Sequence, residues 1–338
     1  MVHRQTHNTT RAAGSTRRSV LAASMALPFV AGPAWSASGD YPDRPIRLVV
    51  PLGPGGVSDI MGRLIAEHAG KLLGQPIVVD NRPGAGGVIG SSVVAQAPAD
   101  GYNLLLGTIG TLAISPSMTV KMPYDPDTAF TPISLLAGSN FAIIANPALP
   151  VRNLPELIAY AKERPGKLNY GSAGNGSTLH LGMELLKSMT GIDIVHVPYK
   201  SSGQVTAAVL AGEVQIGMPD LPSTLPFVQA DKVRLLALTG SKGEATLPGV
   251  RTVAQSGVEG FEIVAWLGLM APANTPQPIV DKLNQATVAA LNSEPMQQSI
   301  AKLVAWPMPS TPQEFSRHLR DERVKWDAVV KRSGVRMS

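Results

Sequence analysis

One stretch, residues 49–59, most constrains how this chain can fold, because it passes from an apolar strand through a glycine-rich turn into an amphipathic helix. It reads Val49-Val50-Pro51-Leu52-Gly53-Pro54-Gly55-Gly56-Val57-Ser58-Asp59. Glycines let the backbone turn its N–H groups toward whatever occupies the loop, and serine and aspartate are residue types that cap helices. A helix start also carries unpaired donors and a partial positive charge. The stretch predicts either an anion-binding loop or an ordinary capped turn.

A second loop repeats this design later in the chain. It reads Ser172-Ala173-Gly174-Asn175-Gly176-Ser177-Thr178 and follows a short predicted strand at 168–171. Here too, a serine or threonine either caps the next helix or faces an anion. Two such loops make a stronger case for anion binding than either loop alone.

Short apolar segments alternate between strand and helix patterns along the chain, which predicts an α/β fold. The predicted strands are 46–50, 76–80, 103–107, 141–145, 168–171, 192–197, 214–218 and 233–239, and the predicted helices include 60–73, 88–97, 154–163 and 204–211. We expect Ile60, Leu64, Ile65 and Leu72 to form the apolar side of the first helix, with Gly74 closing it. The strand–helix–strand order predicts parallel pairs with right-handed crossovers.

The arrangement of these segments favours two lobes. The apolar run 261–272 is rich in strand formers and is interpreted as a return crossing between them. We expect one lobe from residues 38–140 plus 263–338, and a second from residues 141–262. The predicted helices 276–292 and 312–331 are assigned mainly to the first lobe. In open α/β sheets, ligands bind beyond the carboxyl ends of the strands, so the site is expected between the lobes.

Residues 1–37 have the pattern of an export signal. Arg4, Arg11, Arg17 and Arg18 occur there without any acidic residue, and an apolar run from 20 to 31 and the small-residue stretch 34–37 follow. Pro28 interrupts the apolar run, which is too short to span a membrane. The arginine pair is compatible with both a twin-arginine signal and the general export route. A soluble protein of the bacterial envelope is expected.

Removing this signal changes the charge balance. The chain has 29 Lys and Arg against 24 Asp and Glu, and four of the basic residues lie in the signal, which leaves 25 against 24. A nearly neutral mature protein gives no support for nucleic-acid binding. The chain has no cysteine, which excludes disulfides and thiolate chemistry.

The other motifs in the sequence do not favour cofactor binding, metal binding or catalysis. The glycines of residues 84–90 miss the dinucleotide-binding spacing, because Ile89 stands where the third glycine belongs. His180 and Glu184 lie one helical turn apart, but too few further ligands accompany them for a metal site. No nucleophile-elbow pattern occurs. Asp59 and Asp220 follow predicted strand ends, where a carboxylate can act as a general base, a cap or an acceptor for a ligand.

Several longer motifs closely resemble the Bug family, the periplasmic substrate-binding proteins of tripartite tricarboxylate transporters. They are Tyr41-Pro42-x-Arg44-Pro45-Ile46, Gly55-Gly56-x-Ser58-Asp59, the run from Val79 to Gly87, the run from Tyr170 to Leu181, His196-Val197-Pro198-Tyr199-Lys200 and Leu269-x-Ala271-Pro272. The resemblance covers essentially the whole chain after the signal. It departs from the family pattern at Leu52, Pro54, Val57 and Ser201, three of which alter the first loop.

The resemblance implies a two-lobed, type II periplasmic binding protein fold that closes on its ligand about a hinge. Similar proteins hold one carboxylate of an organic acid mainly through backbone N–H groups and waters of the first lobe. The implied first-lobe contacts are Leu52, Gly53, Gly55, Gly56, Ser58, Asp59, Gly86 and Thr108, and the second-lobe contacts are Ser172, Ala173, Ser177, Thr178 and Asp220.

The implied function is capture of a small organic acid, a carboxylate or dicarboxylate, for delivery to membrane transporter subunits. We expect a monomer without cofactor, metal or nucleic acid, and no enzymatic activity. Two alternatives stay open: a ligand-sensing protein for a sensor kinase, and an envelope enzyme that uses Asp59 or Asp220 as a base.

Overall fold

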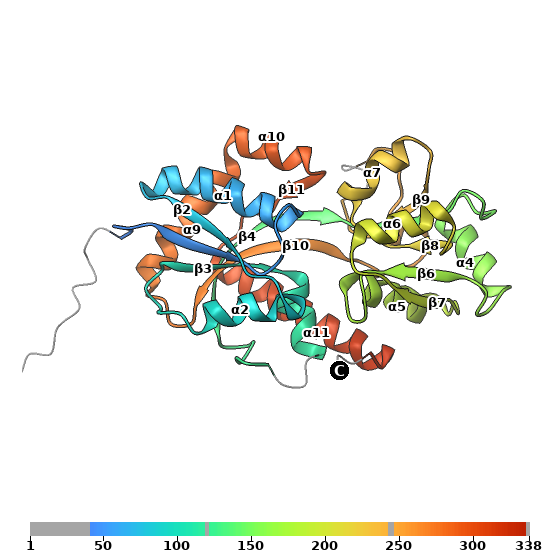
Figure 1. The fold of residues 1–338 in the computed structure, drawn as a ribbon, viewed down its shortest axis with the longest axis horizontal. Coiled ribbons are helices and arrows are strands. Elements are labelled where there is room, and N and C mark those ends of the chain that lie inside the picture. Colours follow the sequence, from blue (N-terminus) through green and yellow to red (C-terminus); the bar gives the residue numbers. More distant parts are fainter. Residues whose placement is uncertain (1–40, 119–121, 243–246, 336–338) are drawn as a thin grey trace, which may run out of the picture. The chain divides into compact units, whose positions relative to one another are not determined.

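The computed structural model describes residues 41–118, 122–242 and 247–335, which form two mixed β-sheets with helices on both faces (Figure 1). The predicted export signal lies outside these residues. The first sheet has the strand order β11-β4-β10-β3-β1-β2 and the second the order β7-β6-β8-β5-β9. The predicted α/β class and its two lobes are confirmed.

The first sheet combines early and late segments of the chain. Its strands are β1 (Ile46–Val50), β2 (Ile77–Asn81), β3 (Asn103–Thr108), β4 (Phe130–Asn140), β10 (Val264–Pro272) and β11 (Ala305–Pro307). As predicted, β1 pairs in parallel with β2, and it also pairs in parallel with β3. Strand β10 runs antiparallel between β3 and β4. The predicted return crossing at 261–272 is therefore a central strand of the first sheet.

Helices cover both faces of the first sheet. They are α1 (Val57–Leu73), η1 (Ala85–Gly87), α2 (Val88–Ala95), η2 (Gly110–Ile114), α3 (Ser115–Met118), α9 (Gln277–Asn292), α10 (Glu294–Lys302) and α11 (Pro312–Ser333). Alternate residues of β1 point to opposite faces, as the strand period of two requires. Leu48 packs in the core formed with α1, α9 and α10, whereas Val49 belongs to the core on the side of α2 and α11.

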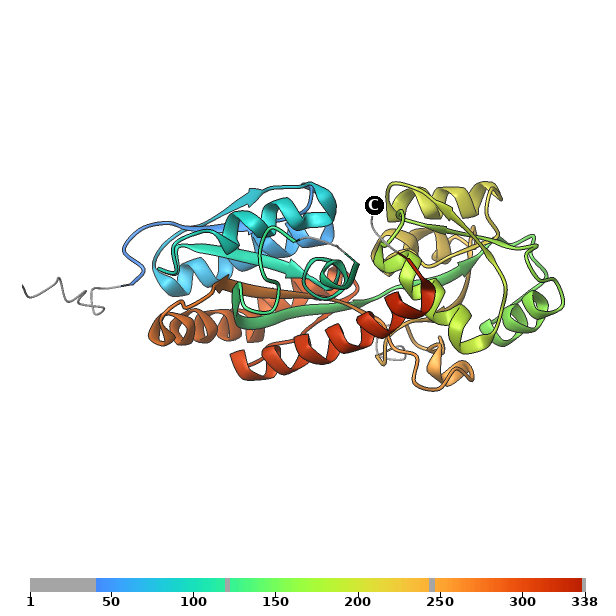
Figure 2. The ribbon, with the colours of Figure 1, turned by 90° about the horizontal axis from the view of Figure 1, so that it is seen from below.

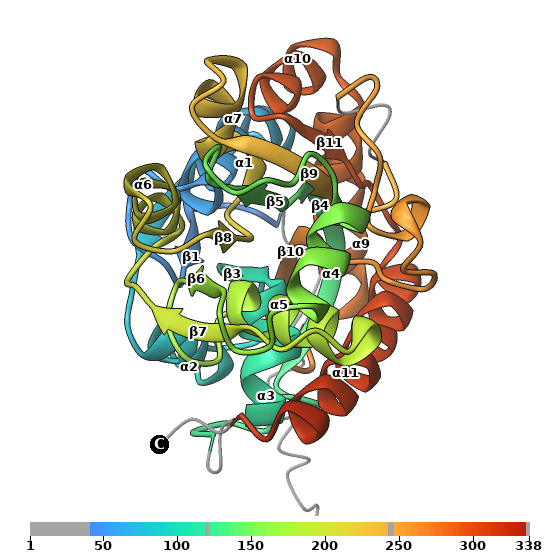
Figure 3. The same cartoon turned by 90° about the vertical axis from the view of Figure 1, so that its right-hand side faces the viewer.

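The second sheet has the same layered design. Its strands are β5 (Ala142–Ala145), β6 (Asn169–Ser172), β7 (Val195–Pro198), β8 (Ile216–Gly217) and β9 (Arg234–Leu238), and its helices are α4 (Leu154–Lys162), α5 (Thr178–Thr190), α6 (Ser202–Ala211), α7 (Leu221–Gln229) and η3 (Ala254–Ser256). Strand β6 pairs in parallel with β7 and β8, and β5 is antiparallel to β8 and β9. Ile143 packs with α4 and α5, and Ile144 with α6 and α7, so these helices lie on opposite sides of the sheet (Figure 3).

Helix α1 differs from its prediction at both its start and its buried face. It begins at Val57 with Gly56 as the N-cap, so Ser58 and Asp59 lie in its first turn instead of capping it. Ile60 and Leu72 are 37% and 57% exposed. The buried stripe is Met61, Ile65, Ala69 and Leu73, together with glycines at 62 and 70. A Cβ at Gly62 would lie 3.1 Å from Val50 Cγ2, so the small residues allow the helix to pack closely on β1.

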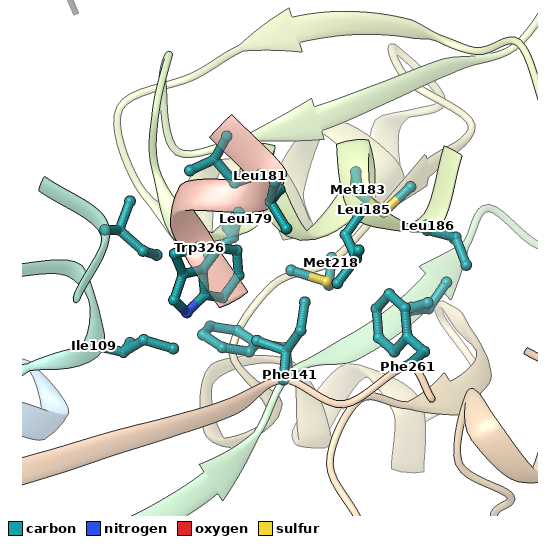
Figure 4. Packing of buried hydrophobic residues seen from close by; sticks show 14 of the residues in the cluster. Ile109, Phe141, Leu179, Leu181, Met183, Leu185, Leu186, Met218, Phe261 and Trp326 are labelled. Atoms are coloured by element: carbon teal, nitrogen blue, oxygen red, sulfur yellow. The ribbon is translucent and has the colours of Figure 1, made fainter. Parts of the chain in front are cut away.

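The two sheets share a buried core at the segments that connect them. Strand β4 of the first sheet continues through Phe141 into β5 of the second, and Phe141 is buried. Trp326 of α11 lies beside Leu179 and Leu181 of α5 (Figure 4). Figure 2 shows α11 running along the first sheet and reaching the second. The assignment of this helix mainly to the first lobe therefore omits its contact with α5.

A buried carboxylate fixes α11 to the crossing strand β10. Glu322 Oε2 accepts hydrogen bonds from Trp266 Nε1 at 2.9 Å and from Trp326 Nε1 at 3.1 Å. Lys325 pairs with the other oxygen of the same carboxylate. Because all these donors converge on one buried acid, the orientation of both indole rings is set by α11.

Glycine at position 90 is required by the close approach of α2 to the ends of β1 and β2. A Cβ there would lie 2.6 Å from the carbonyl oxygen of Arg82 and 2.8 Å from Pro51 Cα. We expect Gly90→Ala to lower the free energy of unfolding by about 1–3 kcal/mol, because backbone atoms must move.

The matched control is Gly203→Ala in α6, whose added Cβ meets nothing within 4 Å. It should raise the free energy of unfolding by about 0.5–1 kcal/mol through helix propensity. Urea unfolding of both variants checks the prediction, which is contradicted if they change stability in the same direction.

Candidate functional site

A cavity of about 520 Å³ lies between the loops of the two sheets and the strands that connect them. The first sheet contributes loops that follow β1, β2 and β3, and the second contributes loops that follow β6 and β8. Since β1, β2 and β3 are parallel to one another, and β6 is parallel to β8, these loops meet at the carboxyl ends of their strands. This is the position in which open α/β sheets bind ligands.

The first wall presents hydroxyl and backbone groups. Ser58 lies in the first turn of α1, and Gly86 follows β2. Thr108 ends β3 and exchanges hydrogen bonds with Thr111: Thr108 N donates to Thr111 Oγ1 at 2.9 Å, and Thr111 N donates to Thr108 Oγ1 at 3.2 Å. The start of α1 has backbone N–H groups without partners inside the helix, which gives this wall a positive potential without a basic side chain.

Asp59 stabilises the glycine-rich loop of residues 53–56 without lining the cavity. Its Oδ2 accepts a hydrogen bond from Gly55 N at 2.9 Å and one from Arg63 Nε at 3.1 Å. These bonds, with that of Arg63 the larger influence, lower the pKa of the Asp59 carboxyl. The carboxylate is buried and does not line the cavity. It therefore shapes the loop that faces a ligand.

The second wall is the loop that leads into α5. Ser177 is the N-cap of α5, and its hydroxyl oxygen accepts from His180 N at 3.2 Å. Ala173, Asn175, Gly176, Ser177 and Thr178 line the cavity. Ser172 lies behind them, fully buried, with its Oγ 2.5 Å from His196 Nε2 and 3.1 Å from the carbonyl oxygen of Gly174.

Two stacked histidines support this wall. The rings of His180 and His196 lie 3.8 Å apart at their centroids and are nearly parallel, at 8°. Gly176 N donates to His180 Nδ1 at 3.0 Å, which requires that nitrogen to be unprotonated. Burial lowers the pKa of His180, and burial together with the neighbouring ring lowers the pKa of His196 to about 4. Both rings are therefore neutral at ordinary pH, and each bonds to the loop.

Strands form the floor of the cavity. Gly138 and Ser139 come from β4, Phe141 from the connection to β5, and Trp266 from β10. Trp266 is 1% exposed and carries the hydrogen bond to Glu322 described above. The floor gives the cavity a largely apolar surface below its two polar walls.

Within the described ranges, no cluster of three or more histidine, aspartate or glutamate residues is placed to hold a metal ion. No helix of the same ranges is long and apolar enough to cross a membrane.

Comparison with known proteins adds a match to the family model of the tripartite tricarboxylate transporter family receptor, TctC, over residues 61–335. The chain belongs to this receptor family. The resemblance predicted from the sequence motifs is thereby confirmed.

Curated and solved relatives agree with this assignment. The receptor is 36% identical over 309 residues to the protein BugT of Bordetella pertussis, covering 91% of this chain and 95% of BugT. It is similar to the structure of Rpa4515 of R. palustris with adipate, at 38% identity and a TM-score of 0.79, over 88% of this chain and 99% of that one. It is also similar to MatC (Rpa3494) of Rhodopseudomonas palustris with bound malate, at 32% identity and a TM-score of 0.74, over 86% of this chain and all of that one.

The structure of the receptor brings most of the predicted site residues to one cavity. Those that line it are Leu52, Ser58, Gly86, Thr108, Ala173, Ser177, Thr178 and Asp220. Gly53, Gly55, Gly56, Asp59 and Ser172 do not line it: the glycines shape the first loop, and the two buried side chains support the loops from behind.

Sequence patterns did not indicate the floor or the turn after β3. Gly110 and Ser115 lie around η2, and Asn175 lies in the second loop, where the pattern gave it no role. Trp266 lies in the apolar run that was interpreted as a crossing. A tryptophan within an apolar strand is the available sequence signal, since a buried indole N–H needs an acceptor.

The neutral histidines predict a pH dependence of stability. The pKa of His196 is about 4 in the folded receptor and about 6.5 in an unfolded chain, so the unfolded state binds more protons between these values. Stability should therefore fall as the pH drops from about 6.5 toward 4. In His196→Gln this dependence should be weaker, whereas the control His68→Gln on α1 should retain it. Denaturant unfolding at several pH values measures both, and equal slopes for the wild type and His196→Gln would contradict the assignment.

Proposed function

We propose that this receptor is an exported, soluble periplasmic binding protein that captures a small organic acid and delivers it to a tripartite tricarboxylate-type transporter. The ligand class is a carboxylate or dicarboxylate, and the chain acts as a monomer without catalysis. One observation carries the proposal: the starts of α1 and α5, on different sheets, both line the same cavity. Helix starts favour anions, and two of them on opposite walls suit an elongated acid.

The relatives support the ligand class. Rpa4515 is solved with adipate and MatC with bound malate, and both of these ligands are dicarboxylates. The departures from the family pattern at Leu52 and Val57 fall on residues that line the cavity. Different acids among relatives are therefore expected.

The cavity chemistry supports capture without turnover. Asp220 is the only ionisable side chain among the described residues that line it. General acid–base catalysis commonly uses two positioned groups with separated pKa values. Backbone donors and hydroxyls instead suit charge-assisted hydrogen bonds to a carboxylate.

We also propose lobe closure about the segments near residues 140–141 and 262–263, with lobes of residues 38–140 plus 263–338 and 141–262. Phe141, the residue between β4 and β5, both lines the cavity and joins the two sheets. Closure would bury the ligand and present a single surface to the transporter, as hinge motions do in binding proteins.

Ser58 provides the test of the first wall. Its side chain lines the cavity, and no described residue forms a hydrogen bond with its hydroxyl. If the hydroxyl donates to a bound carboxylate, Ser58→Ala should weaken binding about 10- to 100-fold, the range for hydrogen bonds to charged groups. The free energy of unfolding should change by less than about 0.5 kcal/mol.

The measurement is isothermal titration of the mature protein with adipate, malate, acetate and the neutral adipamide. The control variant is Ser299→Ala in α10, a half-buried helical serine that does not line the cavity and whose hydroxyl donates to the carbonyl oxygen of Pro295. Absence of heat and of thermal shift with every acid would remove the proposed function. Unchanged affinity in Ser58→Ala would remove this hydroxyl from the site.

A further inference from the structure

Asp220 occupies an unusual position at the end of β8. It is the N-cap residue of α7, yet its side chain accepts no capping hydrogen bond. The second residue of that helix is Pro222, which has no N–H to offer. The backbone N–H of Asp220 donates instead to Ser202 Oγ at 2.8 Å, which fixes the main chain. The carboxyl group therefore does not serve its own helix and lines the cavity.

Among the residues that the structure describes, none supplies a compensating charge to Asp220. Asp220 lies between β8 and α7, is bonded to Ser202 of α6 and pairs with Phe141 next to β5, and none of these four elements has an ionisable residue in its sequence. Beyond the two ends of α6, Lys200 is exposed and Glu213 accepts a hydrogen bond from Tyr199. On the opposite wall, Arg63 is paired with Asp59.

Burial acts on this isolated acid in a known direction. Desolvation raises the pKa of the Asp220 carboxyl, and the hydroxyl of Ser202 acts against that rise. A second carboxylate in the same cavity would raise it further, because two like charges that share a poorly solvated site cannot easily both be ionised. An acidic ligand and an ionised Asp220 therefore oppose each other.

We infer that binding of an organic acid anion to this cavity is coupled to the uptake of one proton by Asp220, whose neutral carboxyl group then donates a hydrogen bond to the bound acid. This inference rests on the proposed function. The balance is simple: an ionised Asp220, one proton from solvent and the ligand anion give a complex with a neutral Asp220. A new O–H bond forms on Asp220, and no bond of the ligand breaks.

The coupling has a definite sign. Above the pKa of Asp220 in the empty protein, binding requires a proton that is increasingly scarce, so the Kd should rise tenfold for each pH unit. Below that pKa, the side chain is already neutral and the Kd should be constant. Acid conditions should therefore favour capture and alkaline conditions release.

The experiment is isothermal titration between pH 6.5 and 9 with whichever of adipate and malate binds more tightly. Both carboxyl groups of these probes are mostly ionised there, since ordinary carboxylic acids titrate near about 4. The lowered pKa values of His180 and His196 also lie below this window. Parallel titrations near pH 8 in HEPES and Tris buffers, which differ in ionisation heat, give the number of protons taken up.

The wild type should take up close to one proton at the alkaline end, with the tenfold rise in Kd per pH unit. Asp220→Asn retains a donor that cannot titrate, so it should bind with a Kd independent of pH and without proton uptake. The control Asp231→Asn changes an exposed acid that follows α7 and should behave as the wild type.

The outcomes separate the two proposals. Binding by the wild type with a constant Kd and no proton uptake overturns the coupling and leaves the proposed function intact. Proton uptake that persists in Asp220→Asn overturns the assignment to this residue. The wild-type titration stands by itself, so the coupling remains testable if Asp220→Asn fails to fold. Lack of binding to every acid removes the function and the coupling together.

Discussion

Backbone N–H groups at helix starts are the constraint on which the rest of this receptor depends. In the first turns of α1 and α5, the backbone N–H groups have no carbonyl oxygen within the same helix to which they could donate a hydrogen bond. Each helix follows a strand, so its first turn lies at the carboxyl edge of a sheet, and the two edges line one cavity. The buried Asp59 and the His180–His196 pair then hold each loop in shape.

Much of the fold follows from sequence periodicity. The strand at Ile46–Val50 has the same bounds in the structure as in the prediction, and the strand at Asn103 and the helix at Leu154 each begin where predicted and end within one residue of the predicted end. In these segments the apolar residues recur with a clear strand or helix period, and turn-forming or capping residues mark where the segments begin or end. Strand β4 was not predicted, although its last eight residues are all buried, because Pro132, Ser134 and the Gly138-Ser139 pair obscure its pattern. Helix α7 was missed for a related reason, since prolines occupy two of its nine positions.

The buried face of α1 shows a different limit of sequence reasoning. A hydrophobicity pattern favours Ile60 and Leu72, which the structure leaves exposed. The helix instead packs through Met61, Ile65 and the small residues Gly62 and Gly70. A Cβ at Gly62 would lie 3.1 Å from Val50 Cγ2, and a Cβ at Gly70 would lie 3.1 Å from the carbonyl oxygen of Gln75. The distance between α1 and the sheet therefore determines which face of the helix is buried, and a pattern of apolar residues does not encode that distance.

The candidate site was predictable in part where it lies on loops after strand ends, and it was unpredictable where it lies within the strands of the floor. Ser58, Ser177 and Asp220 follow strand ends, and parallel strands bring such ends together regardless of their separation in sequence. Gly138 and Trp266 reach the cavity from within strands, and only the pairing of β4 with β10 places them side by side. That pairing joins residues more than a hundred positions apart, which no local signal reveals.

The bonds of Glu322 to Trp266 and Trp326 have a mechanical consequence. Trp266 forms part of the cavity floor, Trp326 packs beside α5, and one carboxylate on α11 connects the two rings. Helix α11 is therefore bonded to strand β10 of the first sheet near its middle, and it packs on α5 of the second lobe through its C-terminal half. Any rotation of one sheet against the other must slide Trp326 across Leu179 and Leu181 while Trp266 stays fixed. Such a rotation would therefore change the packing of α11 against α5 as well as the backbone of the connecting segments.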